Sequence, residues 1–197
     1  MSSALDRVSI IIPLAPGETA HKRLLDDLKP FRAEIIISSE GSRAKSLNAG
    51  AAKANNPFLW FLHADSRVSA ENLVDLEQAL ARRSNALHYF DLAYEEGGLA
   101  ALNACGANIR SRFFDLPYGD QGFCITRTLF EKIGGYPEDV PYGEDLLFVR
   151  QAKRQGIRLN RIPSKLKTSA RKYHKHGWLK LTMLRQWQMM KLLRQEL

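Results

Sequence analysis

Cysteine is scarce in this sequence. The 197 residues include two cysteines, Cys105 and Cys124, which form neither a Cys-x-x-Cys pair nor a spacing typical of a metal site. This scarcity argues against a disulfide-stapled fold and against a zinc site built on thiolates. We expect both side chains to be buried thiols of a protein that works in a reducing compartment.

Long apolar runs are also missing. No stretch is long enough to cross a bilayer, and Met1 to Arg7 lack the apolar region of a signal peptide. We therefore expect a cytoplasmic protein. The sequence shows no internal repeat and no low-complexity linker, and its length fits one domain of ordinary size.

Acidic residues are nearly absent from the last quarter of the sequence. Residues 150–197 hold 14 of the 29 Lys and Arg residues and one acid, Glu196, so this part carries +13 and residues 1–149 carry −5. Such asymmetry is typical of a protein with a polyanionic partner, and equally of a solvated basic face that binds nothing. No recognisable nucleic-acid-binding module accompanies the charge, so we expect no nucleic acid partner.

Apolar runs and helical patterns alternate along the chain. The runs predict strands at residues 8–14, 34–38, 58–62, 88–94 and 157–162. The stretches between them predict helices at residues 19–28, 43–54, 70–80, 99–114, 129–133 and 144–155, with Ser69 and Thr128 as N-caps. This order predicts an α/β fold with a mostly parallel sheet that is covered on both faces.

A further helical pattern begins near Gly177. We predict a domain of residues 1–176 followed by a basic helical extension of residues 177–197. One apolar arc of this helix fits packing on the domain, and the other, with its basic neighbours, fits an anionic membrane surface. The two arcs are Leu179, Met183, Trp187, Met190 and Leu193, and Trp178, Leu181, Met189 and Leu192.

The segment His63-Ala64-Asp65 directly follows the most apolar predicted strand. A carboxylate at the carboxyl end of such a strand lies where open α/β sheets usually bind ligands. Asp65 would there hold a divalent cation against a phosphate, because hard cations take carboxylate oxygens and share the rest of their shell with substrate. The alternative is that Asp65 only caps the following turn.

Two polar loops are further candidates. Residues 117–122, Pro-Tyr-Gly-Asp-Gln-Gly, precede an apolar run, and residues 141–145, Pro-Tyr-Gly-Glu-Asp, open a helix. The first is a turn that also fits a binding loop. In the second, the carboxylates either complement the helix dipole or accept a proton from an incoming hydroxyl.

In their order and spacing these motifs resemble the family 2 glycosyltransferases, and most closely a small bacterial subgroup. The matching segments are residues 48–52, 61–65, 118–122 and 168–171, and the similarity extends from Val8 to about Leu193. The resemblance implies a single Rossmann-like domain of the glycosyltransferase-A type with a mostly parallel mixed sheet. It also implies transfer of a sugar, with inversion, from a nucleoside-diphosphate sugar to an acceptor hydroxyl that the sequence does not identify.

The resemblance also implies roles for individual residues. Asp65 would hold Mn²⁺ or Mg²⁺ on the donor diphosphate, and Asp145 would be the general base. The residues expected near the donor are Pro13, Glu18, Ser39, Glu40, Lys45, Asn48 and His63, and those expected to face the donor sugar or the acceptor are Asp120, Gln121 and Glu144.

Three features depart from the family pattern. Ser39-Glu40 stands where the family usually has a base-binding Asp, the segment between this loop and Asn48 is short, and His63 replaces the first acid of Asp-x-Asp. The short segment favours a rival interpretation, a degenerate domain that serves as a binding or scaffold module. The presence of both Asp65 and Asp145 opposes it.

Overall fold

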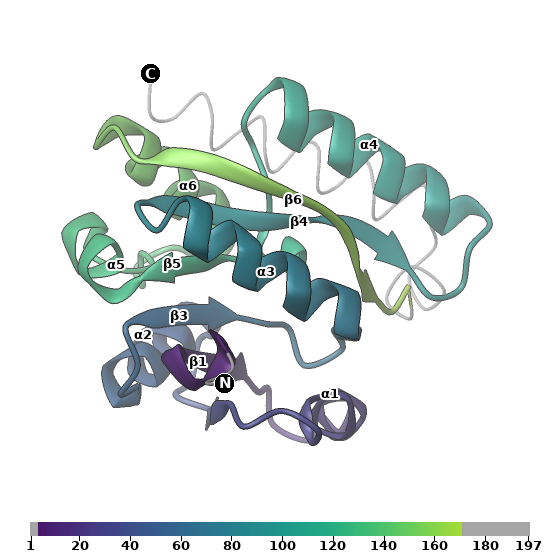
Figure 1. Ribbon diagram of the computed structural model, residues 1–197, viewed down its shortest axis with the longest axis horizontal. Coiled ribbons are helices and arrows are strands. Elements are labelled where there is room, and N and C mark those ends of the chain that lie inside the picture. Colours follow the sequence, from purple (N-terminus) through teal and green to yellow (C-terminus); the bar gives the residue numbers. More distant parts are fainter. Residues whose placement is uncertain (1–3, 171–197) are drawn as a thin grey trace.

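The structure is a computed structural model, and it describes residues 4–170. Within these residues a mixed, twisted sheet of six strands has the order β2-β1-β3-β5-β4-β6 (Figure 1). The strands are β1 Val8–Pro13, β2 Glu34–Ser38, β3 Phe58–Phe61, β4 Ala86–Tyr94, β5 Cys124–Thr126 and β6 Arg158–Thr168. All neighbours pair in parallel except β5, which is antiparallel to both β3 and β4.

Helices cover both faces of the sheet, as the alternating pattern predicts. The elements are the 3-10 helices η1 Ala4–Arg7 and η2 Gly119–Gln121, and the α-helices α1 His21–Leu28, α2 Arg43–Lys53, α3 Ala70–Arg82, α4 Leu99–Phe113, α5 Arg127–Ile133 and α6 Glu144–Arg154. Buried side chains of α2, α5 and α6 share one core with one face of the sheet, and those of α1 and α3 share a second core with the other. Strand β1 serves both cores, because successive side chains point to opposite faces: Ile11 lies in the first, and Ile10 and Ile12 in the second.

The last strand is longer than the sequence predicts. The sequence predicts a strand at residues 157–162, yet β6 continues through Pro163 to Thr168. It is an edge strand, where a missing N–H is tolerated. Its register with β4 also shifts between Phe90 and Asp91, which pair with Ile162 and Lys165, so Pro163 falls in the bulge.

Two smaller predictions are wrong. The N-cap of α5 is Thr126, not Thr128, and its hydroxyl accepts the N–H of Leu129 at 3.3 Å. Thr126 also ends β5, so the strand runs directly into the helix. Cys124 is buried, and burial raises the pKa of its thiol, but Cys105 on α4 is exposed.

The polar backbone of β4 extends beyond its short neighbour β5, and two amide side chains satisfy it there. Asn108 of α4 accepts the N–H of Leu92 at 2.8 Å and donates to the carbonyl of Leu92 at 3.0 Å. Gln121 donates to the carbonyl of Phe90 at 2.9 Å. These bonds attach α4 and η2 to the sheet.

The predicted helix of residues 177–197 and the domain boundary before it lie outside the described residues. Within residues 4–170, no helix is long and apolar enough to cross a membrane.

Candidate active site

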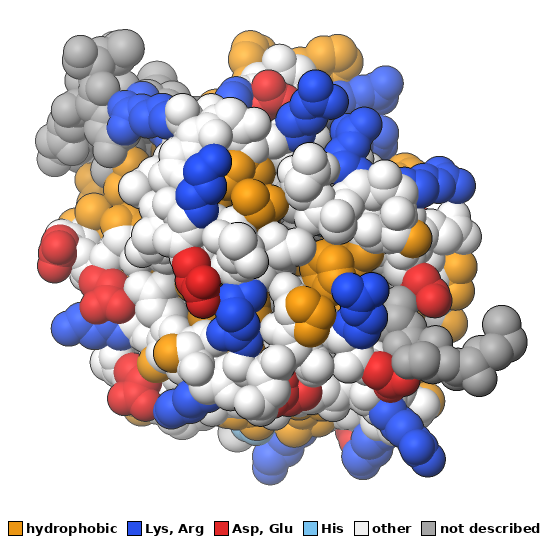
Figure 2. Space-filling view, turned by 60° about the vertical axis from the view of Figure 1, so that its left-hand side comes forward, with side chains coloured by type: hydrophobic (Ala, Val, Ile, Leu, Met, Phe, Trp, Pro, Cys, Tyr) orange, Lys and Arg blue, Asp and Glu red, His pale blue; other side chains and the backbone are white. Residues whose placement is uncertain are grey.

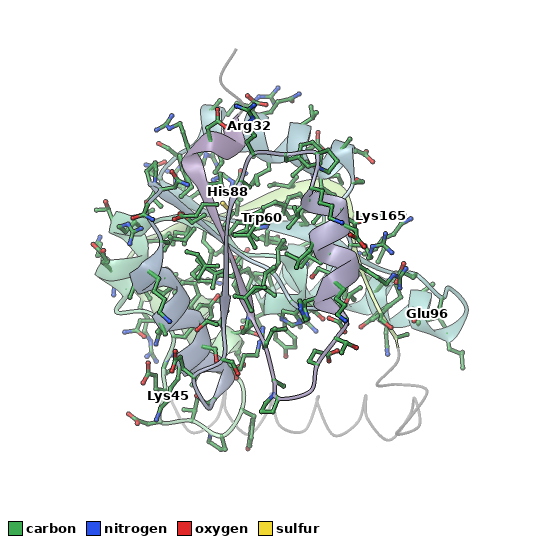
Figure 3. All side chains as sticks on the ribbon, turned by 90° about the horizontal axis from the view of Figure 1, so that it is seen from below. Arg32, Lys45, Trp60, His88, Glu96 and Lys165 are labelled. Atoms are coloured by element: carbon green, nitrogen blue, oxygen red, sulfur yellow. The ribbon has the colours of Figure 1, made fainter. Side chains whose placement is uncertain are left out.

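The loops after β1, β2 and β3 meet at one edge of the sheet. Pro13 pairs with Ser38 where β1 and β2 end, and beyond β3 the N–H of Leu62 donates to the carbonyl of Ile11 at 3.0 Å. The antiparallel β5 begins at this edge, so η2 lies there too. Figure 3 shows Lys45 of α2 at the surface of the same end of the molecule. Because open α/β sheets bind ligands at this edge, it is the candidate active site.

Arg43 is the centre of an ion-pair cluster at this edge. Its Nη1 atom donates to Glu144 Oε1 and to Asp145 Oδ2, both at 2.9 Å, and its Nη2 atom donates to Asp145 Oδ1 at 3.3 Å. Nη2 also contacts Nε2 of His63. Since a guanidinium can only donate, this ring nitrogen accepts. Side chains from α2, from the loop after β3 and from α6 therefore meet at one cation.

The cluster is only partly open to solvent. The Arg43 side chain is 34% exposed, and the side chains of Glu144 and Asp145 are each 13% exposed. Burial alone lowers the pKa of Arg43, but the charges of Asp145 and Glu144 outweigh it and raise the pKa. Arg43 is therefore charged at any pH at which the protein is folded.

Local sequence explains how the two helices present these side chains. Ser42 is the N-cap of α2, and its hydroxyl accepts the N–H of Lys45 at 3.2 Å, which makes Arg43 the first helical residue. Gly143, in the left-handed conformation at φ 80°, precedes α6 and places Glu144 and Asp145 in its first turn. There the carboxylates also complement the helix dipole.

Gly119 brings the backbone of η2 against the same ion pair. A Cβ atom at this position would lie 2.5 Å from Asp145 Oδ1 and 2.6 Å from Arg43 Nη2. Only glycine fits without moving one of these charged groups. The polar loop of residues 117–122 and the start of α6 are thus parts of a single site.

Asp65 follows β3 at the same end of the sheet, two residues beyond His63, in a different environment. Its side chain is partly buried, and among residues 4–170 its carboxylate forms no hydrogen bond and no ion pair. The turn that follows is closed by a backbone bond from Ser66 to His63 at 3.0 Å, so the carboxylate is not needed to cap it. The alternative role of Asp65 as a turn cap has no support among the described residues.

The residues after Asp65 are held in place by hydrogen bonds and an ion pair with Asp27 of α1. Arg67 donates from Nε and Nη2 to the two oxygens of Asp27 at 2.6 and 2.7 Å, and the N–H of Val68 donates to Asp27 at 3.1 Å. Arg67 also approaches Glu95, which accepts two bonds from Arg23. Helix α1 and the end of β4 therefore hold the position of the Asp65 loop.

The donor set at Asp65 fits a hard cation that is bound mainly by its substrate. Within residues 4–170 no three His, Cys, Asp or Glu side chains gather as a ready metal cage. One carboxylate would leave most of the coordination shell to phosphate oxygens and water, which is how Mg²⁺ is usually bound at phosphate sites.

Several other predicted donor residues lie at this end of the sheet. Glu18 accepts the N–H groups of Thr19 and Ala20, both at 2.9 Å, ahead of α1. Glu40 is exposed and pairs with Lys53 at 3.3 Å. Pro13, Ser39 and Lys45 lie at the end of β1, after β2 and in the first turn of α2. Their contacts with a donor stay predictions.

Two further predicted residues have their amide groups bonded within the protein, and their contacts with a ligand stay predictions. Asn48 donates to the carbonyl of Tyr136 at 2.8 Å and accepts the Tyr136 N–H at 2.9 Å, so it holds the loop before α6. Gln121 is fully buried, and its Oε1 accepts from the Ser111 hydroxyl at 2.6 Å and from the Tyr118 N–H at 3.1 Å. Its neighbour Asp120 is partly buried within η2.

Arg43 is the site residue that the sequence analysis missed. A signal was available, since a cation in the first turn of a helix opposes the helix dipole and requires some other reason to be there. Here the reason is the pair of carboxylates 101 and 102 residues further along the chain.

Comparisons with known proteins support the fold. The sequence matches no protein-family model, and a search of curated proteins also finds no match. Among solved structures, S. aureus TarS 1–349 aligns with a TM-score of 0.64 and 15% identity over 83% of this chain and 60% of that one. The mannosyltransferase PcManGT from Pyrobaculum calidifontis, solved with GDP-Man and Mn²⁺, aligns with a TM-score of 0.61 and 17% identity over 87% of this chain and 59% of that one.

A third match is the catalytic domain of Drosophila beta1,4-galactosyltransferase 7, with a TM-score of 0.52 and 13% identity over 79% of this chain and 64% of that domain. The chain thus spans less than two thirds of each of these structures. These likenesses confirm the predicted fold class. The described part of the chain has the glycosyltransferase-A fold.

Proposed function

We propose that this protein is a metal-dependent, inverting glycosyltransferase that uses a nucleoside-diphosphate sugar, as the resemblance to family 2 implies. The observation that carries the proposal is the arrangement at the carboxyl edge of a glycosyltransferase-A fold. An Asp65 carboxylate without a partner among the described residues lies on the same edge as a buried, oriented Asp145 carboxylate. The mannosyltransferase of the same fold, solved with GDP-Man and Mn²⁺, supports the donor class and the ion.

Asp65 is the residue that would hold Mn²⁺ or Mg²⁺ in this proposal. When bound, the ion neutralises charge on the diphosphate that leaves with the nucleotide. The Arg67–Asp27 clamp fixes the loop that carries Asp65, so the carboxylate is held in position before the donor arrives.

Asp145 is the general base in this proposal. The acceptor oxygen forms a bond to the anomeric carbon while the bond from that carbon to the diphosphate breaks, and the electron pair leaves with the nucleotide. The acceptor proton goes to an oxygen of Asp145. Attack from the face opposite the leaving group inverts the configuration.

Arg43 has a positioning role toward that base. Its contacts with both oxygens of Asp145 fix the plane of the carboxylate, and its contact with Glu144 fixes the start of α6. The longer contact, 3.3 Å to Oδ1, is the one that an acceptor hydroxyl would displace more easily.

Binding of nucleoside diphosphates and their sugars, with and without Mn²⁺, tests the proposal in a thermal-shift panel. A ligand that binds only the native state raises the unfolding temperature, so the panel also identifies the donor class. We expect a rise that depends on the metal. Asp65→Asn should abolish the metal-dependent rise, whereas Asp145→Asn should keep it and stop transfer.

Glu77→Gln, at an exposed carboxylate on α3, is the matched control and should change neither property. Unchanged donor affinity of Asp65→Asn in the presence of Mn²⁺ would remove the metal assignment. Transfer by Asp145→Asn at the wild-type rate would remove the general-base assignment.

A second candidate is a degenerate domain of the same fold that binds or scaffolds without catalysis. Two observations favour it: β2 connects to α2 through only Ser39–Ser42, and Arg43 already occupies both oxygens of Asp145. Hydrolysis of a nucleotide sugar in the presence of Mn²⁺ separates the candidates. Hydrolysis that requires Asp65 supports the transferase, and its absence with every donor supports the binding module.

A further inference from the structure

Helix α4 has an unusual composition for a surface helix. Its 15 residues include Arg110 and Arg112 but no acidic residue. Ala100 and Ala104 are buried on the side that packs against the sheet. The helix is apolar on its outward side as well, and a helix that is apolar on both sides normally has both sides covered.

The outward side of α4 carries a continuous apolar stripe. Leu99, Leu102, Ile109 and Phe113 lie three, seven and four residues apart, which places them on one face of the helix. They are 60%, 62%, 49% and 69% exposed, and Phe114, just beyond the helix, is 66% exposed. Five large apolar side chains in one place exceed the isolated exposed residues of an ordinary surface.

A cleft beside this stripe combines apolar walls with cations. Its volume is about 450 Å³, and it lies between α4 and the strands β4 and β6. Ile109 and Phe113 of the stripe line it, together with Arg112, Arg161 and Lys165. Arg161 is neutralised by Asp91, but among the described residues neither Arg112 nor Lys165 forms an ion pair.

The charge of this region selects among possible partners. Two copies of the chain that met through α4 on a two-fold axis would bring the same basic flanks together, which is unfavourable. An anionic phospholipid surface offers acyl chains to the stripe and phosphate groups to Arg112 and Lys165. Figure 2 shows hydrophobic side chains near Lys and Arg side chains at the top of the molecule, the level at which Figure 1 places α4.

The end of the described chain adds to this charge. The N–H of Ala170 donates to Glu96 at 2.9 Å, three residues before α4 begins. The described residues end there, and the sequence that follows Ala170 contains seven Lys and Arg residues and one Glu. Their charge has the sign that an anionic surface attracts.

We propose that the outward face of α4 and the adjoining cleft are a docking surface for an anionic phospholipid membrane. The stripe from Leu99 to Phe113 enters the boundary between headgroups and acyl chains, and Arg112 and Lys165 bind headgroup phosphates. The protein so placed binds one leaflet without spanning it. This inference does not depend on the proposed transferase activity.

Co-sedimentation of the full chain with vesicles tests the proposal. Vesicles of phosphatidylcholine alone are compared with vesicles that also contain phosphatidylglycerol. We expect binding to the anionic vesicles only. The double variant Leu102→Ser, Phe113→Ser should lower the partition coefficient at least roughly tenfold, because two large apolar side chains no longer enter the membrane. Arg112→Gln with Lys165→Gln should lower it about fivefold or more and weaken its salt dependence.

Matched controls use residues of the same type elsewhere on the surface. Val74→Ser removes an apolar side chain that is 53% exposed on α3, and Lys22→Gln with Lys132→Gln removes two exposed cations. Both controls should bind as the wild type does. Far-ultraviolet circular dichroism of each variant, measured in parallel, shows that the fold is retained.

Four results would overturn the proposal. The first is wild-type protein that fails to sediment with anionic vesicles, and the second is binding that neither α4 variant weakens. The third is a serine double variant that loses as much thermal stability as the core substitution Leu76→Ser and keeps its vesicle binding, because the stripe is then covered within the chain. Dissociation of a solution dimer by the double variant, with vesicle binding unchanged, would likewise assign the face to a second copy.

Discussion

Asp145 and Asp65 lie at the same edge of one sheet but are held in opposite ways. Asp145 is 13% exposed in its side chain and is paired with Arg43 through both oxygens. Asp65 is partly buried, and no described side chain touches its carboxylate with a hydrogen bond or an ion pair. The comparison shows that a fold can supply one carboxylate with its hydrogen-bond and ion-pair partners, while it fixes only the backbone that carries another. The second carboxylate then remains available to a ligand.

The largest expected effect on stability comes from removing Arg43, the ion-pair partner of Asp145. Arg43→Met leaves Asp145 and Glu144 close together in a largely buried site without a cation. We expect a loss of about 2–3 kcal/mol in the free energy of unfolding, less than for a fully buried pair because Arg43 is 34% exposed. Urea unfolding measures it.

Asp65→Asn is the natural counterpart and should change the free energy of unfolding by less than about 0.5 kcal/mol. Equal losses in the two variants would contradict the comparison, since they would mean that Asp65 is also paired in the folded protein. Arg43→Lys should lie between Arg43→Met and the wild type, because it keeps the charge and loses the forked geometry.

A smaller effect is expected at Gly119. Gly119→Ala inserts a methyl group within 2.6 Å of Arg43 Nη2 and of both Asp145 oxygens, so the ion pair or η2 has to move. We expect a loss of about 1–2 kcal/mol together with impaired transfer. Gly106→Ala on α4, where nothing lies within 4 Å of the added atom, is the control and should be neutral or stabilising. A fully active Gly119→Ala would argue that the site tolerates displacement of its base.

A further substitution, at Asp27, tests how the Asp65 loop is held in position. Asp27→Asn weakens the two bonds to Arg67 that hold the Asp65 loop from behind. We expect a loss of about 1 kcal/mol in stability, since the pair is partly exposed. The more specific result is a Mn²⁺ concentration requirement that rises severalfold while transfer at saturating metal is retained. A stability loss with an unchanged metal requirement would limit this clamp to a structural role.

Whether the sequence predicts a structural feature depends on how far apart in the sequence the interacting residues lie. Apolar runs identify β1, β2 and β3 because a run of apolar residues is recognised without information from distant parts of the sequence. Strand β5 escapes the analysis because three residues, Cys124–Thr126, are too few for a pattern. The contact of Arg43 with Asp145 joins positions 102 residues apart, and no local rule pairs them.

Amide side chains show a second limit. Asn48 of α2 and Gln121 of η2 are polar residues of the kind that binds ligands, yet within the described residues their amides bond to backbone groups and side chains of the protein. A side chain that binds a ligand and one that holds a loop have the same chemistry, and only their direction in space distinguishes them. Resemblance to a family transfers the position of such a residue but not the direction of its side chain.

The amide side chains on β4 have a consequence for the behaviour of the protein in solution. Beyond the three residues of β5, the backbone of β4 would present open donors and acceptors to any extended peptide. Asn108 and Gln121 occupy these groups at Leu92 and Phe90, as a neighbouring strand would. No further strand can therefore pair with β4 at these positions. This part of β4 is protected from self-association although no strand of the sheet covers it.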